Sequence, residues 1–89
     1  MANTDPNLQS RFLAAVEQSK NLAERPDSAT LLKLYALFKQ ASEGDVSGEK
    51  PGAMDFVGAA KWTARDALRG TATAEAMTRY IALVEELSS

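Results

Sequence analysis

Apolar residues recur at intervals of three and four along four segments of this 89-residue chain. Such spacing places the apolar side chains on one face of a helix, whereas a half-buried strand alternates apolar and polar residues. The segments span residues 8–22, 28–42 and 55–68, and the fourth follows Thr71 or Thr73 as its N-cap. No segment shows strand-like alternation. The pattern therefore predicts an all-α protein, folded as a bundle of four helices.

Each predicted helix carries one apolar face, and we expect these faces to meet in a common core. In chain order, the four faces consist of Leu8, Phe12, Ala15, Val16 and Leu22; of Leu31, Leu34, Leu37 and Ala41; of Phe56, Ala60, Ala64 and Leu68; and of Met77, Tyr80, Ile81, Val84 and Leu87.

Turn and capping signals separate the predicted helices. Arg25 precedes Pro26 and is therefore disfavoured in helical geometry. Asp27 or Ser28 can then cap the second helix. Gly70 is a plausible C-terminal stop in left-handed geometry after the third helix. These signals predict a tight connection between the first two helices.

Residues 43–54 contain three glycines, one proline and few apolar groups, so we expect a loop between the second and third helices. A loop of this length is unusual inside a small bundle unless it has a function or is mobile. We expect it to be functional. It is also long enough to let the second and third helices run parallel, so the helical pattern alone leaves the topology open.

The length of the chain argues for a single domain over residues 1–89, with residues 1–7 as a flexible N-terminus. Its composition, 45% hydrophobic and 25% charged, is that of an ordinary globular protein rather than a disordered one. A segment that could span a bilayer needs about 20 apolar residues, and neither such a segment nor a secretory signal is present. We therefore expect a cytoplasmic protein without integral membrane association, and a monomer.

Charge and residue usage exclude several function classes. A net charge of −2 and a pI near 5.0 provide no global attraction to nucleic acid. The chain has no cysteine and no histidine, so disulfides, thiolate chemistry and the commonest acid–base catalyst and metal ligand are absent. These absences argue against an enzyme and against a metal site.

The stretch over residues 34–62 combines aromatic rings, lysines and the glycine-rich loop. Tyr35, Phe38 and Lys39 are spaced i, i+3 and i+4, so two rings and an ammonium group share one helical face. Lys61 and Trp62 follow from the third helix. This stretch is the candidate functional site.

Within it, residues 35–62 read YxxFKQAxxGDVxGEKPGxxDFxGxAKW, which resembles the signature of the acyl-CoA-binding protein family. The resemblance continues through Leu68, Arg69 and Gly70 to AMTRYIALVEEL and, more weakly, back to Phe12. It implies an up-down-down-up four-helix bundle. It also implies a non-catalytic protein that binds, transports and pools medium- to long-chain fatty acyl-CoA thioesters inside the cell.

The resemblance further implies a set of acyl-CoA-binding residues, namely Lys20, Tyr35, Phe38, Lys39, Lys61 and Tyr80. Among them, Tyr35, Lys39 and Lys61 would hold the 3′-phosphate. Lysine and phenol donors suit this role, since each hydrogen bond to a charged group contributes about 1.5–3 kcal/mol. The ligand is fatty acyl-CoA itself, so no cofactor and no metal are implied.

The remaining residues of this set would serve the nucleotide. Phe38 would stack on adenine, Tyr80 would touch the nucleotide region, and Lys20 would approach from the first helix. Many family members have Tyr at the position of Phe38 and Lys at the positions of Val57 and Ala59. These departures remove a hydroxyl and nearby positive charge, so nucleotide affinity is expected to be lower than is typical of the family.

The acyl chain would lie near Leu31, Leu32 and Trp62, where burial contributes up to about 0.8 kcal/mol per methylene. Packing and solvation offer simpler interpretations of several site residues. Tyr80 lies on an apolar stripe, Trp62 could fill the core, and lysines such as Lys20 are commonly solvated.

Two other function classes remain open. A helical protein-interaction module would use Tyr35, Phe38 and Trp62 as an exposed aromatic face. An acyl-CoA hydrolase or isomerase would need an activated base or nucleophile, and Asp45, Asp55 and Ser42 have no visible activating partner.

Overall fold

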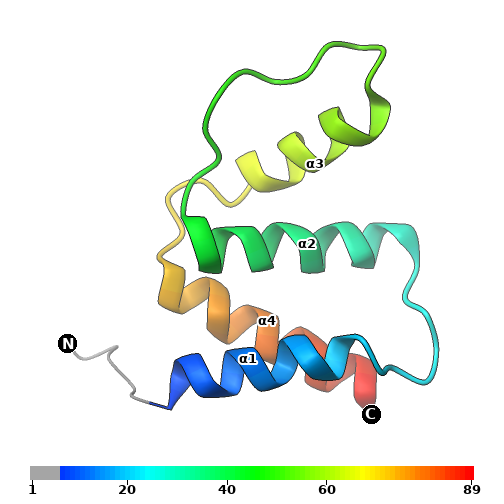
Figure 1. Ribbon diagram of the computed structural model, residues 1–89, viewed down its shortest axis with the longest axis vertical. Coiled ribbons are helices and arrows are strands. Elements are labelled where there is room, and N and C mark those ends of the chain that lie inside the picture. The colour runs from blue at the N-terminus through cyan, green and yellow to red at the C-terminus, as the bar shows by residue number, and fades with distance from the viewer. Residues whose placement is uncertain (1–6) are drawn as a thin grey trace.

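The computed structural model describes residues 7–89, which form four helices and contain no strand (Figure 1). The helices are α1 (Leu8–Ser19), α2 (Ser28–Glu43), α3 (Phe56–Asp66) and α4 (Thr73–Ser88). The predicted all-α class is therefore confirmed. The predicted flexible N-terminus over residues 1–7 lies outside the described residues, apart from Asn7, which is the N-cap of α1.

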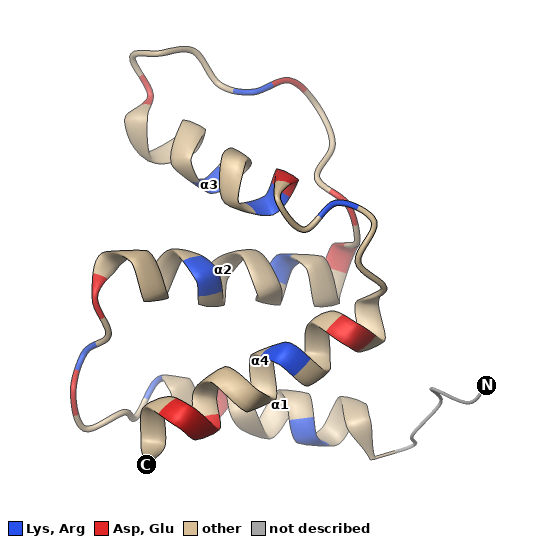
Figure 2. Ribbon diagram, turned by 180° about the vertical axis from the view of Figure 1, so that it is seen from behind, with Lys and Arg blue, Asp and Glu red and all other residues tan. Residues whose placement is uncertain are grey.

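Figure 1 and Figure 2 show the directions of the helices from opposite sides. α1 and α4 run one way, while α2 and α3 run the other, which gives an up-down-down-up bundle. The loop between α2 and α3 returns along the whole length of α2 before α3 begins, and this return makes α2 and α3 parallel. The long loop predicted from its glycines and proline thus sets the topology.

The core is formed by α1, α2 and α4. Phe12 is 3% exposed and lies at its centre, with the ring of Tyr80 edge-on at 5.2 Å and the ring of Phe38 stacked at 6.0 Å, both measured between ring centroids. The other buried members of this cluster are Leu8, Ala15, Leu34, Leu37, Ala41, Ala76, Ile81 and Val84.

α3 lies outside this core and packs against α2 alone among the described helices. None of its residues is buried, and Phe56 is 79% exposed. The prediction that Phe56 and Ala60 extend the core is therefore wrong, because α3 does not reach α1 or α4 and both side chains remain exposed. Leu68, which follows α3, does pack against that cluster.

Two helices end earlier than the apolar spacing predicts. α1 stops at Ser19 instead of Leu22, since the backbone N–H of Asn21 bonds to the Gln18 carbonyl and its side chain bonds to the Glu17 carbonyl. Such bonds to carbonyls three and four residues back are typical of a helix end. α3 stops at Asp66, and residues 67–70 form a turn.

The caps of α2 and α4 differ in kind. Asp27 caps α2, because its Oδ1 accepts a hydrogen bond from the Thr30 N–H at 2.8 Å. This bond lowers the pKa of the Asp27 carboxyl. The N-cap of α4 is Ala72, without a side-chain hydrogen bond, so the prediction of Thr71 or Thr73 as its cap is wrong.

A polar junction joins the start of the loop to the turn before α4. The Gln40 side chain is almost fully buried, and its Nε2 donates to Asp45 Oδ1 at 2.9 Å and to the Thr71 carbonyl at 2.7 Å. The Gly70 N–H donates to the same Asp45 oxygen at 2.8 Å, and Gly70 has the expected positive φ of 87°. The hydrogen bonds from Gln40 and Gly70 lower the pKa of the Asp45 carboxyl.

Candidate ligand-binding site

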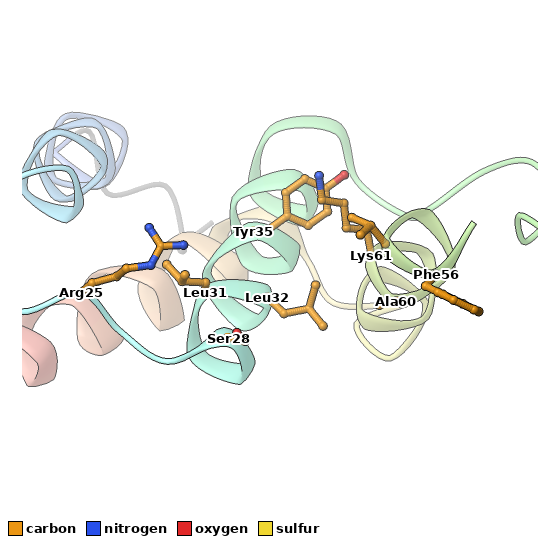
Figure 3. Close-up of a pocket in the computed structure, with 9 residues that line it drawn as sticks. Arg25, Ser28, Leu31, Leu32, Tyr35, Phe56, Ala60 and Lys61 are labelled. Carbon is orange, nitrogen blue, oxygen red and sulfur yellow. The ribbon is translucent and has the colours of Figure 1, made fainter. Parts of the chain in front are cut away.

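A pocket of about 570 Å³ lies between α2 and α3 (Figure 3). Its lining is largely apolar, with two basic side chains. The lining residues are Arg25, Ser28, Leu31, Leu32, Tyr35, Phe56, Val57, Ala60 and Lys61. Pockets of this size with a few polar groups are typical of small-molecule sites.

Tyr35 and Lys61 meet at this pocket, one from each helix. The Lys61 Nζ lies 5.0 Å from the centroid of the Tyr35 ring, within the range of a cation–π contact. Figure 3 shows the two side chains side by side. Lys61 is exposed and Tyr35 is half-buried, so an ammonium group and a phenol can both be offered to an anionic ligand.

Lys39, one helical turn after Tyr35, is held by a carboxylate. Its Nζ lies 3.1 Å from Glu43 Oε2, while the other oxygen of Glu43 lies 3.6 Å from the guanidinium of Arg65. Arg65 also donates to the Gly44 carbonyl at 3.3 Å and is largely buried. Because Glu43 is half-exposed, its ion pair with Lys39 is weak, and an anion can draw Lys39 away at small cost.

Phe38 and Tyr80 face the core. Phe38 is partly buried and stacks on Phe12. Tyr80 is 4% exposed, and its hydroxyl donates to Ser19 Oγ at 3.1 Å. The simpler interpretation, in which Tyr80 packs in the core, therefore describes its position in this structure. A contact between Tyr80 and the nucleotide remains a prediction.

The other predicted site residues lie in different places. Lys20 follows the last residue of α1, is exposed, and pairs with Glu17 at 3.3 Å. Leu31 and Leu32 line the pocket, and their contact with an acyl chain stays a prediction. Trp62 lies outside the pocket lining and donates from Nε1 to the Gly48 carbonyl at 3.3 Å, so it joins α3 to the loop.

Several pocket residues were not predicted to bind a ligand. Arg25 and Ser28 were interpreted as turn and cap signals, and Phe56 and Ala60 as core. Their helical spacing did carry a signal, since residues 56, 57, 60 and 61 lie on one face of α3. The spacing does not indicate which neighbouring helix this face of α3 packs against.

Residues 7–89 contain no group of three or more histidine, cysteine or carboxylate side chains placed to hold a metal ion. Within the same range, no helix has the length and hydrophobicity required to cross a bilayer.

The sequence profile of the family described as acyl CoA binding protein matches residues 9–84, which is most of the chain and includes both sides of the pocket. The chain belongs to the acyl-CoA-binding protein family. Acyl-CoA-binding protein homolog 1 of Caenorhabditis elegans is 52% identical over 76 residues, which cover 85% of this chain and 88% of that protein.

Similar proteins include a solved structure and a larger protein. Acyl-CoA-Binding Protein 2 of Oryza sativa superposes with a TM-score of 0.86 at 36% identity, covering 91% of this chain and 88% of that one. Enoyl-CoA delta isomerase 2 of Rattus norvegicus is 44% identical over 81 residues, which cover 91% of this chain but 21% of that protein. A sequence similar to this chain thus makes up most of the nematode protein and about one fifth of the rat protein.

Proposed function

We propose that this chain binds medium- to long-chain fatty acyl-CoA thioesters in the pocket between α2 and α3 and carries them, unreacted, in the cytoplasm. One observation carries the proposal. The Lys61 ammonium lies against the Tyr35 ring at a pocket whose remaining lining is mostly apolar. A fatty acyl-CoA has the matching chemistry, because it joins a phosphorylated nucleotide to a hydrocarbon chain.

The polar end of the ligand would be held by Tyr35, Lys61 and Lys39. Phosphate oxygens accept several hydrogen bonds at once, and each bond from an ammonium or a phenol contributes about 1.5–3 kcal/mol. Lys39 would exchange its ion pair with Glu43 for one with the phosphate. We assign the 3′-phosphate to this group of donors. Phe38, which is only partly buried, would stack on adenine.

The apolar end would lie along Leu31 and Leu32 of α2 and against Phe56 and Val57 of α3. Each methylene removed from water contributes up to about 0.8 kcal/mol. Phe56 and Val57 are 79% and 65% exposed, so a chain lying on them would cover apolar surface that now faces water. Affinity should therefore rise with chain length until this surface is covered.

The arrangement supports binding without catalysis. Asp45 accepts hydrogen bonds from Gln40 and Gly70, and Asp55 caps α3 through the Gly58 N–H. Both carboxylates thus have structural roles, and neither is activated as a base. In addition, about four fifths of the rat isomerase lies outside the region that this chain matches. That relative therefore favours a binding unit over an isomerase.

Calorimetric titration tests the proposal. The protein should bind a C16 acyl-CoA far more tightly than either free CoA or the free C16 fatty acid, because only the thioester fills both ends of the site. The thioester should be recovered intact after incubation, as shown by the absence of free thiol. Equal affinity for the fatty acid alone would contradict the nucleotide half of the site, and release of thiol would contradict the carrier function.

A further inference from the structure

One carboxylate at the end of α2 is shared by two cations. Glu43 is the last residue of α2, and its Oε2 lies 3.1 Å from the Lys39 Nζ while its Oε1 lies 3.6 Å from the Arg65 Nη2 of α3. Figure 2 shows acidic and basic segments close together where the last turns of α2 and α3 lie side by side. Lys39 is a proposed donor to the 3′-phosphate, so Glu43 is placed beside the position of an anionic ligand group.

Lys39 cannot serve both Glu43 and a phosphate without bringing negative charges together. An ammonium group has three N–H donors, so it can contact both acceptors at once. The two anions then lie close to each other and repel. The Lys39 side chain is partly buried, so water screens this repulsion incompletely. A phosphate that binds Lys39 should therefore displace the carboxylate of Glu43.

Arg65 offers Glu43 a second partner. Its side chain is 15% exposed, and its Nε is buried without a hydrogen-bond acceptor among the described residues. Its distance of 3.6 Å from Glu43 exceeds the separation of about 2.7–2.9 Å that is typical of a hydrogen bond between charged groups. The pair of Glu43 with Arg65 is thus incompletely formed. A carboxylate released from Lys39 can use the remaining donor capacity of the guanidinium.

We propose that Glu43 sets the affinity for acyl-CoA by competing with the 3′-phosphate for Lys39, and that Arg65 retains the carboxylate when the phosphate takes Lys39. This inference rests on the proposed function, since it concerns the same phosphate and the same donors. In the free protein, Glu43 neutralises Lys39. In the complex, Glu43 lies on Arg65 and joins the end of α2 to α3. Arg65 lowers the cost of the exchange, because Glu43 keeps one cation after it loses the other.

A simpler interpretation is an ordinary ion pair between residues four positions apart on a helix. Such pairs stabilise a helix slightly and have no further role. α4 contains one, in which Arg79 Nε lies 2.9 Å from Glu75 Oε2 and both side chains are about half exposed. Neither residue has a proposed contact with the ligand. The pair on α4 therefore provides a matched control for the pair on α2.

Calorimetric titration with a C16 acyl-CoA tests the competition in the wild type, Glu43→Gln and Glu75→Gln. Each substitution removes one negative charge from a helical ion pair and keeps the size of the side chain. Glu43→Gln should tighten binding about two- to fivefold, which corresponds to the usual contribution of a partly exposed ion pair. Glu75→Gln should leave the affinity unchanged. Unchanged or weaker binding by Glu43→Gln would overturn the proposal, and so would an equal gain in both variants.

Two further titrations test whether the effect of Glu43 acts through Lys39 and the 3′-phosphate. The gain from Glu43→Gln should disappear when the ligand is the dephospho-CoA thioester. It should also disappear in a protein that carries Lys39→Met as well. A merely structural role of Glu43 would change affinity in the same way with and without the phosphate. A gain that survives either change would overturn the proposal.

The role of Arg65 is tested by Arg65→Gln in two backgrounds. Binding should weaken about twofold when Glu43 is present, because the carboxylate then depends on Lys39 for its charge pairing and releases it less readily. The loss should be absent in the Glu43→Gln background, and Arg65→Lys should largely retain wild-type affinity. An equal loss in both backgrounds would assign Arg65 to the loop through the Gly44 carbonyl and overturn its part of the proposal. The titrations of Glu43→Gln decide the competition even if Arg65→Gln does not fold.

The two proposals fail in different ways. If the wild type binds the C16 acyl-CoA and Glu43→Gln binds it no more tightly, the competition is wrong and the carrier function stands. If the wild type does not bind the acyl-CoA, both proposals are wrong.

Discussion

The buried cluster of α1, α2 and α4 and the pair formed by α3 and its loop are built on different principles. The first is held by side chains such as Phe12 and Val84, which are 3% and 1% exposed. The second buries no residue of α3, and hydrogen bonds from Trp62 to the Gly48 carbonyl and from Arg65 to the Gly44 carbonyl join α3 to its loop. Stability is concentrated in one region, whereas the apolar surface available to a ligand is concentrated in the other.

This division allows fold and function to be changed separately. α2 belongs to both regions, since Leu34 and Leu37 face the cluster while Leu31, Leu32 and Tyr35 line the pocket. The single helix therefore positions the site on a rigid base. Substitutions on its two sides should have different effects, and so should substitutions in the two regions.

The largest effect is expected from Phe12→Ala. Phe12 contacts the rings of Phe38 and Tyr80, so its truncation leaves a cavity at the centre of the core. The free energy of unfolding should fall by about 3–5 kcal/mol in urea denaturation. The matched truncation Phe56→Ala, in α3, should change it by less than about 0.5 kcal/mol, as is usual for surface positions. Similar losses of unfolding free energy in both variants would show that the two regions contribute equally to stability.

Lys61→Ala should have the opposite pattern of effects, with weaker ligand binding and unchanged stability. Acyl-CoA binding should weaken by about 1.5–3 kcal/mol in calorimetry, because a phosphate loses a charged donor. The thermal midpoint of the apo protein should hardly move, since an exposed charge contributes little to folding. The loss should be much smaller with the dephospho-CoA thioester. A loss that is independent of the 3′-phosphate would mean that Lys61 contacts another part of the ligand.

Tyr80→Phe distinguishes packing from ligand contact at one residue. The substitution keeps the ring against Phe12 and removes the hydroxyl that donates to Ser19. We expect the free energy of unfolding to fall by about 0.5–1.5 kcal/mol, the usual contribution of one hydrogen bond. Binding should be unchanged if Tyr80 only packs. Weaker acyl-CoA binding with an unchanged free energy of unfolding would instead place the hydroxyl at the nucleotide.

The smallest expected effect is on the stability of the protein at low pH. Because its hydrogen bonds lower the pKa of Asp45 in the folded protein, the unfolded chain binds more protons at this group as the pH falls. The stabilisation is thus present above the ordinary pKa of aspartate, about 3.9, and is lost as the pH falls through the lower folded value. Urea denaturation between pH 6 and pH 3 should show a weaker pH dependence for Asp45→Asn than for the wild type. If the pH dependence of the free energy of unfolding were the same in both proteins, Asp45 would not contribute to it.

The sequence predicted the core more accurately than the site. Helical spacing identified Phe12, Leu34 and Val84 correctly, because a core residue needs only to be apolar and to lie on the right face. The same spacing led to an error at Phe56, since a helix that covers a ligand pocket carries the same pattern as one that covers a core. Periodicity reports that a face is apolar, and only the tertiary arrangement reports what it faces.

The binding residues show the same limit. Tyr35 and Lys61 were recognised through the family motif, and their contact depends on a parallel pairing of α2 and α3 that no local pattern specifies. Arg25 was interpreted as a turn signal because it precedes a proline, and its place in the pocket lining follows from where the chain turns. The junction of Gln40 with Asp45 also required the structure, since a buried amide has no signature in the sequence.

The pairing of α1 with α4 has a consequence for how the chain folds. The hydrogen bond from Tyr80 to Ser19 joins residues 61 positions apart, and the one from Gln18 to Ser88 spans 70 positions. Helical proteins usually fold quickly because most of their contacts are local. Here the two ends of the chain must find each other before the Phe12 cluster can form, and closing so long a segment costs conformational entropy. Folding should therefore be limited by the meeting of the terminal helices, with α3 docking afterwards.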